Sequence, residues 1–107
     1  MRVKWSDKAK QTWKESFEYC VSNYGVHFGK KLSDILLKKT TSLSAYPEIG
    51  SPMPKLDSAN YSYRSVVLYK DYKIIYRIDY QNDYVIIIDI VNMRMDYDNL
   101  REKVSGK

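Results

Sequence analysis

Three strand-like runs follow one another in the second half of the chain, and they restrict its fold more than any other feature. They are Tyr61–Tyr69, Tyr72–Asp79 and Tyr84–Val91, and each is rich in β-branched and aromatic residues. The short breaks at Lys70-Asp71 and Gln81–Asp83 suit tight hairpin turns. The sequence therefore predicts a small meander of antiparallel strands. Basic side chains on this meander indicate a surface for RNA or for a protein partner.

The middle run alternates between two kinds of side chain, which indicates its two faces. Tyr76 falls among the apolar residues of one face, whereas Lys73 and Arg77 fall on the other. We therefore expect the first face to pack against helices and the second to be partly open. In the last run, Val85–Ile88 is apolar on both faces, as is typical of a central strand.

The first half of the chain predicts one strand and two helices. Arg2–Trp5 alternates like a short strand, and Ser6 is a suitable N-cap for an amphipathic helix that ends near Gly25. A second amphipathic stretch runs from Val26 to Ser44. The order strand, helix, helix, strand, strand, strand predicts an α+β domain. In it, an antiparallel helical hairpin packs on one face of a small, largely antiparallel sheet.

Two segments show neither helical nor strand periodicity. Residues 45–60 contain three prolines and a glycine, and they predict a surface loop from helix to sheet. We expect Tyr46 and Ile49 to anchor this loop to the core. After Arg94, residues 95–107 form a polar tail, which is expected either to make one or two helical turns or to stay mobile.

The size and charge of the chain narrow its partners. A length of 107 residues fits a single domain that spans the whole chain. The 18 basic and 13 acidic residues give a formal net charge of +5, a mild excess that favours an acidic protein or a nucleic acid. No run approaches the roughly 18–20 apolar residues of a membrane span, and the start lacks the apolar segment of a secretion signal. We therefore expect a cytoplasmic protein with no membrane partner.

The residue types available for catalysis are few. One histidine, one cysteine and four scattered glycines predict no metal site, no catalytic triad and no phosphate-binding loop, so no cofactor is expected. Cys20 lies on an apolar helix stripe and is expected in the core, and His27 is expected on the surface. RNA cleavage stays open, because the RNA 2′-hydroxyl is itself the nucleophile. An enzyme that cleaves RNA then has to orient this hydroxyl, neutralise the charge of the phosphate and assist the departure of the leaving oxygen.

Five side chains on or beside the meander have types that suit such a reaction. They are Arg64, Lys73, Tyr76, Arg77 and Arg94. Tyr76 belongs to the apolar face of its strand, which favours core packing over catalysis. Arg77 has a structural alternative as well, an ion pair with Asp79 or Asp89 across the sheet.

Four short motifs occur in a fixed order along residues 1–98. They are Val3–Ala9; Leu43 with Pro47–Gly50; Tyr63-Arg64 with Tyr72–Ile78; and Val85–Val91 with Arg94. Together they resemble the RelE/ParE superfamily of toxins from bacterial type II toxin–antitoxin modules. The long helical hairpin and the Pro47–Gly50 loop look more like the ParE side of this superfamily.

The resemblance implies a growth-inhibiting toxin that a cognate antitoxin holds inactive by wrapping a partly disordered, often acidic segment across it. ParE-like members bind and inhibit DNA gyrase without catalysis, and this is the role we expect. RelE-like members are instead ribosome-dependent mRNA endonucleases that need no metal. A third alternative is an inert relative that only binds antitoxin.

The resemblance also implies where the functional residues lie. RelE-like catalytic positions fall at Arg64, Lys73 and Arg94, with Tyr97 as a further candidate, although the superfamily has an arginine where this chain has Lys73. We expect the three cations to converge on one accessible surface. An acidic antitoxin segment would contact Arg64, Lys73, Arg77 and Arg94, add a helix or a strand, and build a toxin–antitoxin hetero-oligomer.

Overall fold

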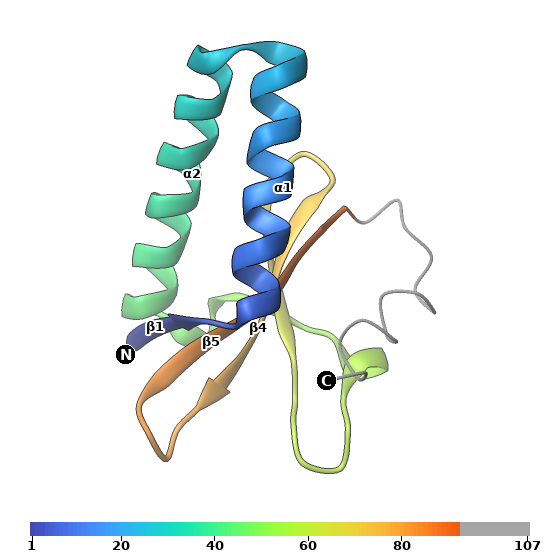
Figure 1. Ribbon diagram of the computed structural model, residues 1–107. Helices are drawn as coiled ribbons and strands as arrows, with labels where there is room; N and C mark the ends of the chain where they lie inside the picture. Colours follow the sequence, from blue (N-terminus) through green and yellow to red (C-terminus); the bar gives the residue numbers. More distant parts are fainter. Residues whose placement is uncertain (93–107) are drawn as a thin grey trace.

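Two antiparallel helices cover one face of a five-stranded sheet in the computed structural model, which describes residues 1–92 (Figure 1). The helices are α1 (Asp7–Tyr24) and α2 (Val26–Ala45), and 3-10 turns occupy Pro47–Ile49 and Pro54–Leu56. The strands are β1 (Arg2–Trp5), β2 (Ser51–Pro52), β3 (Arg64–Tyr69), β4 (Tyr72–Asp79) and β5 (Tyr84–Asn92). This architecture confirms the predicted α+β fold. The predicted tail, residues 95–107, lies outside the described residues.

The sheet has the order β1-β5-β4-β3-β2, and the meander forms its centre. β3, β4 and β5 are antiparallel to one another, as predicted, whereas β1 runs parallel to β5. A parallel neighbour requires a long crossover connection, and the helical hairpin is part of it. None of the helices among residues 1–92 has the length and apolar character to cross a membrane.

Ser6 fixes the point at which α1 leaves the sheet. Its Oγ accepts a hydrogen bond from the Ala9 amide at 3.0 Å, which is the predicted N-cap. The same hydroxyl donates to the Ile88 carbonyl at 2.9 Å, and the Ser6 amide donates to the Ile87 carbonyl at 3.0 Å. At the other end, Gly25 separates α1 from α2 with a φ of 94°, a backbone conformation that favours glycine.

The helix side of the sheet holds the larger of two apolar clusters. Ile74 and Tyr76 of β4 lie at its centre, and both are fully buried. The remaining buried members come from all parts of the fold: Ala9, Leu36, Leu43, Leu68, Val85, Ile87 and Ile90. This confirms the prediction that one face of β4 packs against the helices.

A second apolar cluster lies on the opposite face of the sheet, and the loop before β3 covers it. Met53 and Leu56 from this loop are buried against Ile75 and neighbouring residues. The expectation that Tyr46 and Ile49 anchor the loop is wrong, because these side chains are 69% and 61% exposed. Turns centred on prolines have no periodicity, so the sequence pattern did not show which of their apolar residues face inward.

Tyr76 ties this loop to the middle of the sheet. Its hydroxyl donates to the Pro47 carbonyl at 2.6 Å and accepts from the Gly50 amide at 2.9 Å. A Cβ atom at position 50 would lie 2.5 Å from that hydroxyl and 2.8 Å from the Ser65 carbonyl, so the approach requires glycine. Tyr76 is therefore a core residue whose polar end holds the loop, as its place on the apolar face predicted.

Replacing Tyr76 by phenylalanine should lower the free energy of unfolding by about 1–3 kcal/mol. The change leaves the part-buried Pro47 carbonyl and the buried Gly50 amide without their partner, and such groups carry a desolvation penalty of about that size. Urea unfolding followed by circular dichroism measures the loss. Tyr46→Phe, at an exposed site, is the matched control and should unfold like the unmodified protein. Equal midpoints for the two variants would contradict the role given to the Tyr76 hydroxyl.

Alkaline pH should destabilise the fold through its buried phenols. Burial raises the pKa of Tyr63, Tyr72 and Tyr76 above the ordinary tyrosine value. Folding therefore favours the protonated phenol, and this stability is fully present below the unfolded pKa of about 10 and is lost as the pH rises through the folded values. Urea midpoints measured from pH 8 to 11 should fall above about pH 10, and less steeply in Tyr76→Phe. A midpoint that stays constant over this range would contradict the prediction.

Candidate partner-binding surfaces

Part of the Arg64 guanidinium has a structural role, because it holds backbone carbonyls of the loop that follows α2. Its Nη1 donates to the Gly50 carbonyl at 2.8 Å and to the Glu48 carbonyl at 3.1 Å. Arg64 lies opposite Tyr76 in the register of β3 and β4, and paired residues share a face of the sheet. Tyr76 belongs to the helix-side cluster, so Arg64 emerges on the helix side, beside the loop that Tyr76 holds.

Lys73 emerges from the opposite face of the sheet. It lies two residues before Ile75, which belongs to the second cluster, and alternate residues of a strand share a face. It lines a hollow of about 260 Å³ at the edge of β3, to which Lys39 of α2 also contributes. The structure therefore does not bring Lys73 together with Arg64, which lines a different pocket.

The other predicted site residues are placed as follows. Arg94 and Tyr97 lie outside the described residues. Arg77 is half-buried, and its Cζ lies 4.3 Å from the centroid of the Tyr61 ring, within the range of a cation–π contact. It lines the same pocket as Arg64. Arg77 lies two residues after Ile75, so its side chain emerges on the same face of the sheet as Lys73 and on the opposite face from Arg64. The roles of all four predicted catalytic residues stay predictions.

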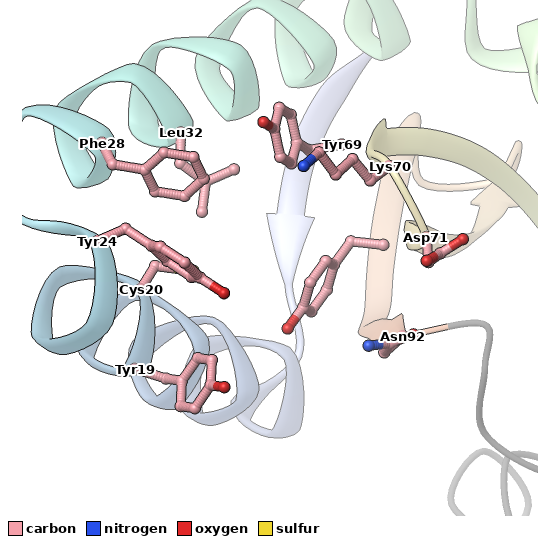
Figure 2. A pocket seen from close by; sticks show the side chains of 10 residues that line it. Tyr19, Cys20, Tyr24, Phe28, Leu32, Tyr69, Lys70, Asp71 and Asn92 are labelled. Carbon is pink, nitrogen blue, oxygen red and sulfur yellow. The ribbon is translucent and has the colours of Figure 1, made fainter.

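A pocket of about 410 Å³ lies between the end of the helical hairpin where α1 joins α2 and the turn that joins β3 to β4. Figure 2 shows side chains of α1 and α2 facing those of the turn across it. Its walls carry five aromatic rings, and polar side chains stand at the turn. The lining residues are Tyr19, Cys20, Tyr24, Phe28, Leu32, Tyr69, Lys70, Asp71, Tyr72 and Asn92. We call this the aromatic pocket.

Ring contacts give the aromatic pocket a fixed wall. Phe28 of α2 lies 5.3 Å from the Tyr24 ring and 5.6 Å, edge to face, from the Tyr69 ring, measured between centroids. Such pairs stabilise by about 0.5–1.5 kcal/mol beyond the area that they bury. Tyr24 nevertheless stays 64% exposed and Tyr19 stays 57% exposed, so the apolar surface is open to a partner.

Partial burial favours the neutral forms of two groups that line the aromatic pocket, the Tyr72 phenol and the Cys20 thiol. Burial raises the pKa of the Tyr72 phenol, and the Asn92 side chain, which hydrogen-bonds it, opposes that rise in part. Burial also raises the pKa of the Cys20 thiol. Both groups are therefore neutral at physiological pH, which makes Cys20 a packing residue, as predicted, and a poor nucleophile. Among residues 1–92 no group of three His, Cys, Asp or Glu side chains is placed to hold a metal ion.

Sequence reasoning did not find the aromatic pocket. The sequence predicted two amphipathic helices, and Figure 1 shows that the end of the hairpin where α1 joins α2 extends beyond the strands. Tyr24 and Phe28, which line the aromatic pocket, belong to this end of the two helices. The length of the stripes, compared with the length of the strands, was the available signal.

A helical hairpin packed on an antiparallel meander is the fold that the resemblance to the RelE/ParE toxins implies. One solved structure, of the chromosomal ParDE TA system from P. aeruginosa, is similar with a TM-score of 0.67. The match covers 86% of this chain and 95% of that chain at 17% identity, which supports the likeness in fold alone.

The family is shown by the sequence itself. The family model described as ParE toxin of type II toxin-antitoxin system, parDE, matches residues 3–97. The chain therefore belongs to the ParE toxin family, which confirms the predicted superfamily and its ParE-like branch. No curated protein matches the sequence. Membership in a family of toxin–antitoxin systems implies an antitoxin as partner.

Proposed function

We propose that the chain is neutralised by an antitoxin segment that occupies the aromatic pocket, and that the free toxin inhibits DNA gyrase without catalysis. The observation that carries the proposal is an open, ring-lined pocket of about 410 Å³ in a member of the ParE family. Exposed apolar groups rimmed by polar side chains often mark a contact site for a partner, and we take the aromatic pocket as such a site.

The chemistry of the aromatic pocket suits an amphipathic segment. Apolar anchors of a helix would pack against the Tyr24 and Phe28 rings, which line the pocket between the helical hairpin and the β3–β4 turn. Lys70 stands at the rim, with its Nζ 5.4 Å from the centroid of the Tyr69 ring. Its ammonium offers a partner for an acidic residue beside those anchors, which matches the +5 charge of the chain.

The placement of the cations favours inhibition by binding over RNA cleavage. Stabilising the transition state of phosphodiester cleavage requires donors that converge on one phosphate. Arg64 and Lys73 emerge on opposite faces of the sheet, and Arg64 Nη1 is held by two backbone carbonyls. The ribosome-dependent nuclease therefore has less support than gyrase inhibition, and the experiment that follows separates the two.

Purified toxin should inhibit DNA supercoiling by gyrase, and Lys73→Ala should inhibit equally well, within about twofold, because surface cations contribute little individually. The measurement is a supercoiling assay with relaxed plasmid over a range of toxin concentrations. A translating extract given the same proteins is the parallel readout.

Unaffected gyrase at large molar excess of toxin would contradict the proposal. Messenger RNA that is cleaved in the presence of the unmodified toxin, but stays whole in the presence of the Lys73→Ala variant, would establish the nuclease instead. Growth that continues after the toxin alone is induced would indicate an inert relative that only binds antitoxin.

Tyr24→Asp should weaken antitoxin binding about tenfold or more. The new carboxylate would be buried when an apolar side chain of the antitoxin occupies the aromatic pocket, and burying an unpaired charge is costly. Isothermal titration with the antitoxin encoded beside the toxin gene measures the change. Tyr46→Asp introduces the same charge at a side chain that is 69% exposed and does not line the aromatic pocket, so it should bind normally. Equal affinities for the two variants would exclude the aromatic pocket as the antitoxin site.

A further inference from the structure

The rings of the aromatic pocket stand at angles to one another, so they form a concave wall and not a stack. The planes of Tyr24 and Phe28 are inclined by 51°, and those of Phe28 and Tyr69 by 79°. Tyr19 from α1 and Tyr72 from β4 line the same pocket. Figure 2 shows Tyr19, Tyr24 and Phe28 on the side of the helices. The volume of about 410 Å³ lies within the range of small-molecule sites.

The phenol oxygens of three tyrosines lie near one another in this pocket. Burial is the largest cause that raises the pKa of the Tyr72 phenol. The neighbouring Cys20, Tyr19 and Tyr24 raise that pKa further, which requires all three groups to lie close to Tyr72. The oxygen atoms carry partial negative charge, as do the faces of the aromatic rings. The pocket therefore presents negative partial charge from groups that have no net charge.

One ring of the pocket already contacts an ammonium group of this chain. Lys70, in the turn between β3 and β4, has its Nζ 5.4 Å from the centroid of the Tyr69 ring, within the range of a cation–π contact. Figure 2 shows the Lys70 side chain reaching back beside that ring. On the other side of the pocket, Tyr19 and Tyr24 are 57% and 64% exposed, so their rings are open to a second cation.

Of a cation, an anion and an apolar ligand, the cation matches these groups best. An anion requires several donors, and within residues 1–92 the only cationic side chain that lines the pocket is Lys70. An apolar ligand would separate the phenol oxygens from water and give them no partner, which costs free energy. A methylated ammonium group is attracted by the ring faces and the oxygens together, and its methyl groups also bury apolar area.

We propose that the aromatic pocket binds a small organic cation through a methylated ammonium group. The ring faces would contact the methyl groups, and the phenol oxygens of Tyr19, Tyr24 and Tyr72 would lie beside the positive charge. Lys70 opposes binding, because its ammonium repels the ligand and occupies the Tyr69 ring. The inference does not rest on the proposed function, since it concerns the chain without antitoxin or gyrase.

The test compares three probes of nearly the same shape and different charge. They are choline; its uncharged analogue 3,3-dimethylbutan-1-ol, in which carbon replaces the nitrogen; and the anion 3,3-dimethylbutanoate. Each is titrated into the ¹⁵N-labelled full chain, and nuclear magnetic resonance follows the backbone amides. Choline should shift amides of residues 19–32 and 69–72 and should saturate. It should bind at least about fivefold more tightly than the alcohol, as expected for a cation–π contact, and the anion should bind most weakly.

Two variants and a matched control locate the effect in the aromatic pocket. Tyr24→Leu keeps an apolar side chain but removes a ring, so it should weaken choline binding about fivefold and leave alcohol binding within about twofold. Lys70→Gln removes the competing ammonium, so it should strengthen choline binding about two- to fivefold and weaken binding of the anion. Tyr46→Leu removes a ring at an exposed site outside the pocket and should bind choline like the unmodified chain.

Binding of the alcohol or of the anion that equals or exceeds binding of choline would overturn the proposal. Absence of choline binding, or shifts outside residues 19–32 and 69–72, would overturn it as well. This comparison uses the unmodified chain, so it decides the question even if a variant does not fold.

A fourth probe, capped trimethyl-lysine, distinguishes the sources of the cation. A preference of about tenfold for this probe over choline would support the site and assign the cation to a protein side chain. None of these results bears on the supercoiling assay or the antitoxin titration, which contain no choline. A chain that binds choline and leaves gyrase untouched would keep this inference and remove the proposed target.

Discussion

The hydroxyl of Tyr76 is the contact on which the rest of the structure depends. It reaches from the helix-side core to the Pro47 carbonyl and the Gly50 amide, and so fixes the loop that leaves α2. The two carbonyls that orient Arg64 belong to the same loop. The chain then continues into Ser51–Pro52, which pairs with β3, and into the buried residues that cover the opposite face of the sheet. The Tyr76 hydroxyl thus helps to position β2, the loop residues of the second apolar cluster and the Arg64 side chain.

The register of β3 on β4 decides which cations meet. A two-residue turn at Lys70-Asp71 with regular pairing would set Arg64 opposite Arg77, on the face that carries Lys73. The structure has an irregularity between Val67 and Tyr69, and Arg64 pairs with Tyr76 instead. A shift of one residue moves a side chain to the other face of the sheet. This irregularity places Arg64 on the other face of the sheet from Lys73 and Arg77, and the proposal of inhibition by binding rests in part on that separation.

Much of the fold was predictable, because it follows from local periodicity. The stripes of the two helices, the Ser6 cap and the alternation of Tyr72–Asp79 each express a rule that acts within one element. The site was less predictable, because it depends on how elements meet. Neither the irregularity in β3 nor the distance by which α1 and α2 pass the sheet leaves a local pattern. The resemblance to the RelE/ParE toxins gave the family, but it could not give the face on which Arg64 emerges.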